Sequence, residues 1–430
     1  MKRLAAALLA FEAMCSCQLA FSTVGSWTTQ AGPPAPITTN NVVALPDGRV
    51  AIFGGLSLQT GQESAQTVLY DPVHNTWTGG APMPGPAFPD VVAALQDGTV
   101  LVEGGLDTRT GTMSGATWLY DPARNSWSRA GDVLEPRGRP GATRLSDGRV
   151  LIAGGGVPLA QPVQLPNGTV SNVQQVTSAE IFNPTTHEWS KGGDLHAARG
   201  SMALVALPGG RALAAGGCLG TTGYTPPLAA AEVFDPTTLT WSVTAPIPEA
   251  TCGAAGVELR DGRALLVTVG FFNTSPAAYV YDPTARRWSA AGALAGGGTT
   301  ALVLSDGRVF VPEVQPGAPQ GRIFKDLVGG QIFDPATNQW TYVTTTSVPL
   351  PLVYMYSGGL QISVALPDGS AVVILQTVAL AFHPRTAPPA TQLLDSTGLT
   401  TLLLAIAVVI GLLMLLAYRR SGRIDNSKLQ

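Results

Sequence analysis

The stretch that decides the fold is Leu-Ser-Asp-Gly-Arg-Val-Leu-Ile-Ala-Gly-Gly, residues 145–155. Its Asp-Gly pair supplies the positive φ angles that a two-residue hairpin turn needs. The run that follows, Val150 to Ala153, is apolar throughout, which is typical of an inner strand covered on both faces. The stretch therefore predicts two antiparallel strands of a buried sheet that leave through a glycine pair.

The same stretch recurs along the chain. Seven turns share its position, at Asp47-Gly48, Asp97-Gly98, Asp147-Gly148, Gly209-Gly210, Asp261-Gly262, Asp306-Gly307 and Asp368-Gly369. An aromatic residue followed by Asp-Pro or Asn-Pro recurs with a Trp five residues after each Pro, at Trp77, Trp127, Trp189, Trp241, Trp288 and Trp340. One repeat unit therefore has two strands around the Asp-Gly turn and two around the Asp-Pro or Asn-Pro turn, which together form a four-stranded sheet. Such a sheet cannot bury both of its faces alone. We therefore predict an all-β fold, a seven-bladed β-propeller in which seven sheets close a ring.

The ring needs a last strand for its seventh blade, whose signature is the degenerate Phe382-His383-Pro384 with no Trp after it. Trp27 lies 21 residues before Gly48, and Trp77 lies 21 residues before Gly98. Trp27 thus has the spacing of an outer-strand Trp. We expect residues 24–31 to complete blade seven, so that it is closed by the N-terminal strand.

A glycine pair follows the turn glycine by six residues in four units, at Gly54-Gly55, Gly104-Gly105, Gly154-Gly155 and Gly216-Gly217. With the aromatic residue and the Trp, this pattern resembles the kelch family over residues 27–384. The resemblance implies a kelch-type propeller over residues 23–384. Kelch propellers include copper oxidases similar to galactose oxidase and sugar mutarotases, so the resemblance alone does not decide between binding and catalysis.

Both ends of the chain carry membrane signals. Residues 1–22 have a basic start and an eleven-residue apolar run, as a signal peptide does, although lipidation at Cys15 or Cys17 is an alternative. Residues 399–418 are uncharged and long enough to span a bilayer, with Arg419 and Arg420 directly after them. We expect a C-terminal transmembrane helix there, a Pro-rich stalk over 385–398 and a cytoplasmic tail over 419–430. The propeller would then be extracytoplasmic, at the cell surface or in a periplasm.

The loop after each glycine pair and the loop after each Trp strand share one face of the ring, which we call the loop face. Nearly all variation in loop length falls there, as in residues 157–176 and 312–328. Cys218 ends the second strand of blade four, and Cys252 begins the first strand of blade five. In an oxidising compartment we expect a disulfide between them, the alternative being two buried thiols.

Charged residues are scarce, at 12% of the chain, and the net charge is −3 without a central basic run, so nucleic acid is not an expected partner. The candidate ligand-binding residues are charged side chains that interrupt apolar strands or precede inner strands. They are Glu103, Arg137, Arg139, His196, Arg199, Glu258 and Glu313. Their alternative role is a solvated channel lining or ion pairs between blades, while Glu180 and Glu232, which recur before the aromatic signature, are interpreted as structural.

No catalytic set, metal-ligand set or cofactor site is predicted. The four histidines, His74, His187, His196 and His383, do not match a copper site. The leading hypothesis is a membrane-anchored binding module for a protein or glycan that uses the loop face. The alternatives are a sugar-processing enzyme of the kelch mutarotase type that uses the central channel, and a structural envelope protein.

Overall fold

The computed structural model describes residues 25–34, 37–38, 41–57, 64–85, 88–107, 112–164, 170–219, 227–268, 276–294, 300–316, 324–349, 362–374 and 378–384. The chain forms two units, residues 1–384 and 385–430. The expected signal peptide, stalk, transmembrane helix and tail lie outside the described residues. Among the described residues, no helix has the length and apolar character needed to cross a membrane.

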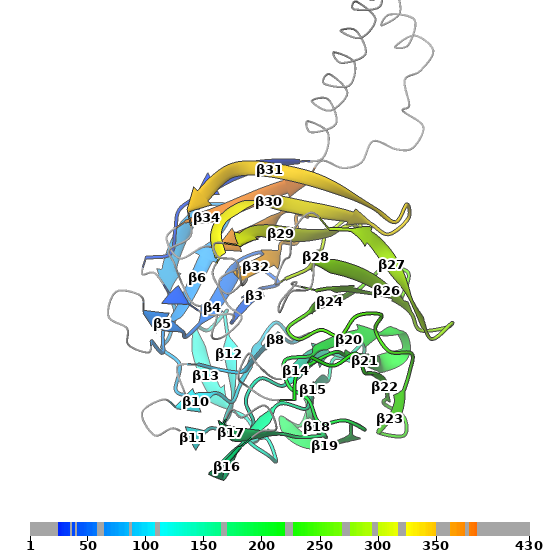
Figure 1. The fold of residues 1–430 in the computed structure, drawn as a ribbon. Coiled ribbons are helices and arrows are strands. Elements are labelled where there is room, and N and C mark those ends of the chain that lie inside the picture. Colours follow the sequence, from blue (N-terminus) through cyan, green and yellow to red (C-terminus); the bar gives the residue numbers. More distant parts are fainter. Residues whose placement is uncertain are drawn as a thin grey trace, which may run out of the picture. The chain divides into compact units, whose positions relative to one another are not determined.

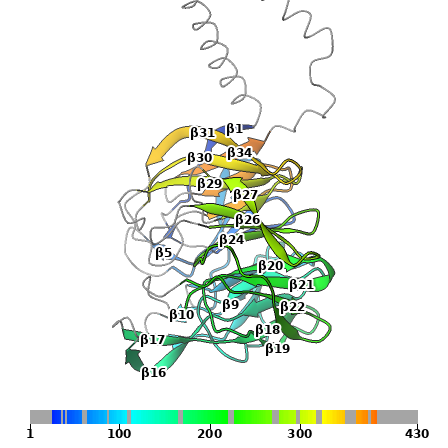
Figure 2. The ribbon, with the colours of Figure 1, turned by 45° about the vertical axis from the view of Figure 1, so that its right-hand side comes forward.

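The first unit is a seven-bladed β-propeller, as the repeat predicted (Figures 1 and 2). Each blade is a four-stranded antiparallel sheet. Blade one contains β3 (Val42–Ala44), β4 (Val50–Phe53), β6 (Thr67–Asp71) and β7 (Thr76–Gly79). Blade two contains β8 (Val91–Ala94), β9 (Val100–Glu103), β12 (Thr117–Asp121) and β13 (Ser126–Arg129). Blade three contains β14 (Gly141–Arg144), β15 (Val150–Ala153), β18 (Ser178–Asn183) and β19 (Glu188–Asp194).

The remaining blades repeat this order. Blade four contains β20 (Ala203–Leu207), β21 (Arg211–Ala215), β22 (Ala231–Asp235) and β23 (Thr240–Val243). Blade five contains β24 (Ala255–Glu258), β25 (Ala264–Val267), β26 (Ala277–Asp282) and β27 (Arg287–Ala293). Blade six contains β28 (Leu302–Val303), β29 (Val309–Pro316), β30 (Phe324–Asp334) and β31 (Gln339–Pro349). Blade seven contains β32 (Ile362–Ala365), β33 (Ala371–Ile374), β34 (Ala379–Pro384) and β1 (Gly25–Gln30).

Blade seven is closed by the N-terminal strand, which confirms the expectation from Trp27. β1 pairs antiparallel with β34, with Gly25 opposite Pro384 and Trp27 opposite Phe382. Each inner strand lies beside the inner strand of the next blade, and β32 of blade seven lies beside β3 of blade one. The ring is therefore complete, and β1 covers the outer edge of β34 in blade seven.

The turns form for the reasons that the sequence suggested. Gly148 has a φ of 91°, a conformation that favours glycine, and Asp147 Oδ1 accepts a hydrogen bond from the Arg149 amide at 3.0 Å. In the Asp-Pro turn, Asp71 Oδ1 accepts the amides of Val73 and His74 at 2.9 and 3.1 Å. Both kinds of turn lie on the face opposite the loop face, which we call the turn face.

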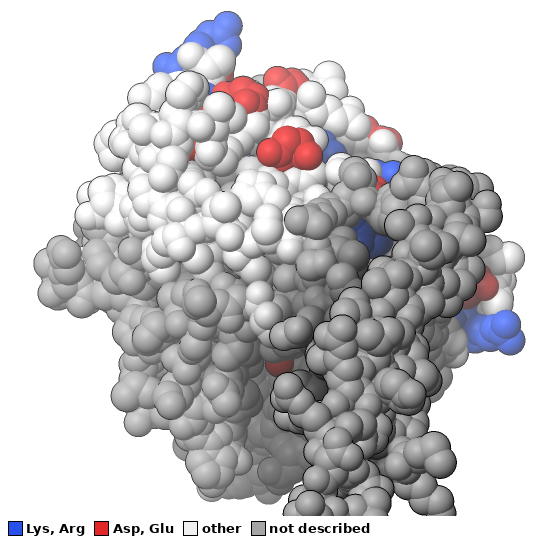
Figure 3. Space-filling model, turned by 90° about the horizontal axis from the view of Figure 1, so that it is seen from above, with Lys and Arg blue, Asp and Glu red and all other residues white. Residues whose placement is uncertain are grey.

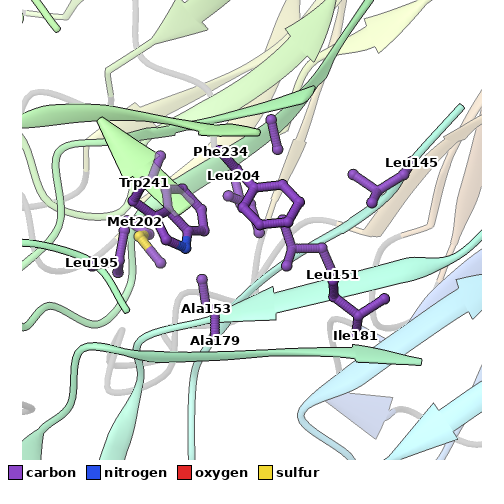
Figure 4. Close-up of a cluster of buried hydrophobic side chains, with 12 residues drawn as sticks. Leu145, Leu151, Ala153, Ala179, Ile181, Leu195, Met202, Leu204, Phe234 and Trp241 are labelled. Carbon is purple, nitrogen blue, oxygen red and sulfur yellow. The ribbon is translucent and has the colours of Figure 1, made fainter. Parts of the chain in front are cut away.

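The core is divided among the interfaces between blades rather than gathered at one centre. Seven clusters of buried apolar side chains occur among the described residues, one for each pair of neighbouring blades. Figure 4 shows the cluster between blades three and four, where Leu151 of β15 and Phe234 and Trp241 of blade four meet. Each recurrent aromatic residue packs against the Trp of its own blade, as Phe234 does against Trp241 with ring centroids 5.2 Å apart.

The structure differs from the sequence-based expectation at two long loops. Most of residues 157–176 form a hairpin of β16 (Gly156–Gln164) and β17 (Val170–Gln175), with a register shift between Pro158 and Val163. In blade six the insertion lengthens two paired strands. β29 extends to Pro316, and β30 begins at Phe324. The blade six insertion continues its paired strands directly, whereas β16 and β17 form a separate two-stranded sheet beyond Gly154-Gly155. In both places the added residues gain backbone hydrogen bonds by pairing with each other. Shorter pairs, β2 (Ile37–Thr38) with β5 (Leu56–Ser57) and β10 (Leu106–Asp107) with β11 (Thr112–Met113), lie on the same face.

Candidate functional site

The predicted site residues fall into separate places, two of which hold more than one of them. Glu103, Arg137 and Arg139 meet at the loop-face end of the interface between blades two and three. His196 and Arg199 lie at the corresponding end between blades three and four. Glu258 lies at the turn-face end of β24, and Glu313 lies on β29 in blade six.

The first group contains four carboxyl groups and two guanidinium groups. We call it the acidic junction, and its residues are Asp90, Glu103, Glu135, Arg137, Arg139 and Glu180. Arg137 lies in the segment that leads into β14, and its side chain is fully buried. Its Nη2 donates to Glu180 Oε1 at 2.5 Å and to Glu135 Oε2 at 3.2 Å. Glu180 also accepts the backbone amides of Leu134 and Glu135, at 2.6 and 3.1 Å.

Glu103 ends β9 at a position where the sister blades carry Phe53 and Ala153. Its side chain is completely buried, and neither carboxylate oxygen has a hydrogen-bond partner among the described residues. Burial, and then the charge of Asp90, raise the pKa of Glu103 well above its usual value, although the charge of Arg137 opposes this. Among the described residues, a buried carboxyl group without a hydrogen-bond partner is a clear departure from ordinary propeller packing.

Asp90 directly precedes β8, and sequence reasoning did not select it. Its amide donates to the Glu103 carbonyl at 3.0 Å, and its Oδ1 accepts the Arg139 amide at 3.0 Å. Burial raises the pKa of Asp90 to about 6. Arg139 itself has a left-handed backbone, with a φ of 53°, and an exposed side chain. Asp90 thus joins blade two to the segment that leads into blade three.

The junction between blades three and four, consisting of His196, Arg199 and Glu232, repeats the ion pair of the acidic junction. Arg199 Nη2 donates to Glu232 Oε1 at 2.5 Å, and Nη1 donates to the carbonyls of Gly216 and Ala230 at 3.2 and 2.7 Å. Both side chains are buried. Glu180 and Glu232 therefore have the structural role that was expected for them, and the buried guanidinium groups of Arg137 and Arg199 are engaged by protein groups.

His196 differs from the residues around it because its side chain is about half exposed, at 55%. Its Nδ1 lies 2.8 Å from Glu232 Oε2, and its amide donates to the same oxygen at 2.7 Å. The buried carboxylate thus holds one ring nitrogen and fixes the orientation of the ring. The arrangement is suited to hydrogen bonding or proton exchange at the loop face.

The other two candidates stand apart. Glu258 is exposed at the end of its inner strand, and burial raises its pKa. Glu313 is buried beside Tyr342, with which it forms a hydrogen bond, and burial raises the pKa of Glu313 and raises that of Tyr342 to about 12. These two side chains do not form a common site with the acidic junction.

The predicted disulfide between Cys218 and Cys252 is present, and it joins blade four to the segment that leads into blade five, with Cα atoms 5.4 Å apart. Seen from the side shown in Figure 3, the described surface carries charged side chains that are scattered among uncharged ones. This view agrees with the low charge content of the chain.

Comparison with solved structures supports the fold. A fungal alcohol oxidase of the AA5 family in complex with copper superimposes with a TM-score of 0.59 at 14% identity, over 87% of this chain and 78% of the oxidase. YjhT superimposes with a TM-score of 0.51 at 17% identity, over 73% of this chain and 99% of YjhT. At these identities the likeness establishes the propeller fold alone. No protein-family model matches the sequence, and no curated protein is significantly similar to it.

The described residues do not fit a copper centre of the kind that an oxidase would need. His74 and His187 lie in turn-face loops, His383 contacts Thr28 on β1, and His196 is held by Glu232. In the part of the chain that the structure describes, no three His, Cys, Asp or Glu side chains are grouped to hold a metal ion. Copper prefers imidazole and thiolate ligands; the four histidines lie at separate places, and the two described cysteines are bonded to each other.

Proposed function

We propose that this protein is a membrane-anchored binding module of the kelch type, whose loop face over blades two to four binds a protein or glycan outside the cytoplasm. The propeller serves as a rigid frame, residues 385–398 as a stalk, and residues 399–418 as the membrane anchor. Export by a signal peptide over residues 1–22 is consistent with the disulfide, which forms in oxidising compartments.

The observation that carries this proposal is the contrast between the two faces. On the turn face, near-identical turns satisfy their own charges, as Arg49 does with Asp47 and Arg263 does with Asp261. The loop face carries the hairpin of β16 and β17, the disulfide, and the partly exposed His196 and Arg139. Irregular elements on one face of a rigid scaffold are where recognition usually lies.

Exposed apolar side chains on the same face favour a protein ligand over a purely polar one. Leu134 is 56% exposed, Val163 on the β16 hairpin 46% and Leu219 beside the disulfide 48%. Scattered singly, such residues would need no explanation, but these three come from loop-face segments of blades three and four. A protein ligand could bury them together with the backbone edges of the hairpin.

The test shortens the hairpin without disturbing the blade. Gly156 and Gln175 are opposite each other, so residues 157–174 can be replaced by Asn-Gly, which favours a tight hairpin turn. The detergent-solubilised full chain, its hairpin variant and a turn-face control, Val73→Asp, are compared on a glycan array and in cross-linking to surface proteins. We expect the hairpin variant alone to lose its ligand. Equal binding by all three would reject the loop face as the recognition surface.

A second candidate, a sugar-processing enzyme, is favoured by one observation, the exposed imidazole of His196 held by the buried Glu232. This geometry suits a general base or acid. Turnover of a sugar that is abolished in His196→Gln and retained by the hairpin variant would favour this candidate over the binding module.

A further inference from the structure

One position of the inner strand recurs in every blade, three residues before the Asp-Gly or Gly-Gly turn. In each blade this residue pairs with a buried residue of the second strand, as Arg144 does with Val150 and Glu258 does with Ala264. Together these residues form what we call the axial ring, at the turn-face end of the inner strands. Five of its seven members are Ala or Val and two are charged: Ala44, Ala94, Arg144, Ala206, Glu258, Val303 and Ala365.

The side chains of Arg144 and Glu258 are exposed toward the axis of the propeller. Their strands, β14 and β24, pair with a second strand on the outer side and lie beside the inner strands of the neighbouring blades (Figure 1). Exposure is therefore possible at the axis and at its turn-face end. Ala142, which lies two residues before Arg144 on the same side of β14, is exposed as well. The open space thus continues along the strand.

Neither of the two charges is matched within the described part of the propeller. Arg144 and Glu258 form no ion pair and no side-chain hydrogen bond with a described residue. Burial raises the pKa of Glu258, and no described cation opposes this effect. Arg149, in contrast, is bound by Asp147 in the turn that follows Arg144. Because five sister blades have Ala or Val in the axial ring, the fold itself does not require these charges.

We propose that Arg144 and Glu258 bind a free α-amino acid with an aliphatic side chain at the turn-face end of the axis. Arg144 holds the carboxylate and Glu258 holds the ammonium group through charge-assisted hydrogen bonds. The aliphatic side chain contacts the Ala and Val members of the axial ring, from which it displaces water. A ligand with a single charge would pair with one of the two protein charges and leave the other without a partner. The site lies on the face opposite the loop face, so it goes beyond the binding function proposed above.

The test is isothermal titration calorimetry of the full chain in detergent. The probes are L-leucine, isocaproate, which lacks the ammonium group, and isoamylamine, which lacks the carboxylate. We expect L-leucine to bind one site per chain with a dissociation constant of about 10⁻⁵–10⁻³ M, a range open to a ligand of this size. Each single-charge analogue should bind at least about tenfold more weakly, because it loses one charge-assisted contact.

The variants Arg144→Ala and Glu258→Ala introduce the residue that other blades have in the axial ring, so the propeller should still fold. Both should bind L-leucine at least about tenfold more weakly than the wild type. Arg149→Ala, which removes an exposed arginine outside the ring, should bind it like the wild type. So should the hairpin variant, because the loop face takes no part in this site.

Several outcomes would overturn the proposal. Unchanged affinity for L-leucine in both ring variants would do so, as would an analogue that binds as tightly as L-leucine. Loss of binding in the hairpin variant would place the amino acid on the loop face instead. A wild type that binds none of L-alanine, L-valine and L-leucine below about 10 mM would also reject the site. The comparison of probes on the wild type decides the matter even if neither ring variant folds.

Discussion

Trp27 and Phe382 lie opposite each other in the sheet of blade seven, with ring centroids 5.2 Å apart, although 355 positions of sequence separate them. Trp27 also contacts Phe310 of blade six, at 5.6 Å. A single side chain from the N-terminal strand thus joins blade seven internally and connects it to its neighbour. The closure of the ring depends on this strand, because no other described strand covers the outer edge of β34.

We predict that Trp27→Ala lowers the free energy of unfolding by about 2–4 kcal/mol, since a partly buried aromatic residue loses its packing and leaves a cavity. Urea unfolding followed by circular dichroism measures the loss. Thr29→Ala changes an exposed residue of the same strand and should cost less than about 0.5 kcal/mol. Equal losses in the two variants would mean that β1 does not close the ring as described.

The disulfide between Cys218 and Cys252 should stabilise the propeller by about 3–4 kcal/mol, because it closes a loop with a sequence separation of 34 and so restricts the unfolded chain. The double variant Cys218→Ser/Cys252→Ser should therefore unfold at lower urea than the wild type. Reducing agent should lower the midpoint of the wild type and leave that of the double variant unchanged. Two alkylatable thiols in the unreduced wild type would contradict this prediction.

The stability of the protein should depend on pH through Glu103. Its pKa is raised in the folded state above the usual 4.5, so its favourable contribution is present below pH 4.5 and is lost as the pH rises toward the folded value. Asp90, whose pKa is raised to about 6, contributes in the same direction. Without divalent cations, Glu103→Gln should gain stability relative to the wild type as the pH rises, by up to about 1.4 kcal/mol per pH unit.

The measurement is urea unfolding of both proteins at pH 5 and pH 8 in EDTA. The Gln variant should have a similar midpoint to the wild type at pH 5 and a higher one at pH 8. A constant difference at both pH values would show that Glu103 does not titrate differently in the folded and unfolded states.

The buried pair of Arg137 and Glu180 should be sensitive to removal of one partner. Arg137→Ala is expected to lower the free energy of unfolding by about 3–5 kcal/mol, because Glu180, with a side chain only 3% exposed, keeps its charge without a counterion. Replacing both by leucine should cost much less. Arg149→Ala breaks an exposed pair with Asp147 and should cost about 0.2–1 kcal/mol. Similar losses for Arg137→Ala and Arg149→Ala would contradict the assignment.

The fold could be predicted because the repeat depends on interactions between residues that are close in the sequence. Turn glycines, prolines and the spacing of Trp residues depend on backbone geometry within one blade, and the sequence displays them directly. The register of Trp27 even predicted the long-range pairing of β1 with β34. Blade seven lacked an outer strand, and the N-terminal strand had no blade of its own, so the two were expected to pair. The hairpin of β16 and β17 was less visible, because Pro158 and Pro162 interrupt the pattern of its first strand.

The site was predicted only in part. Glu103 was conspicuous in the sequence because it replaces an apolar residue. Its lack of a hydrogen-bond partner could not be predicted, because it depends on which acceptors the packed structure places around Arg137. Asp90 was missed because it belongs to no motif and precedes a strand by one residue. One further signal was present in the sequence. An Arg eleven residues before the turn glycine occurs together with a Glu two residues before the aromatic residue in blades three and four, whereas blade two has Ala87 and Trp118 there.

The pairing of Gly25 with Pro384 also means that the order of the blades is cyclic and that the position of the chain ends is arbitrary to the ring. A short linker between these two residues, with a new opening at the exposed Asp-Gly turn of another blade, would produce a circular permutant with the same seven interfaces. In such a permutant the proposed anchor, residues 399–418, could leave from any chosen blade. The natural opening in blade seven would then be one of seven equivalent places at which the same ring can be opened.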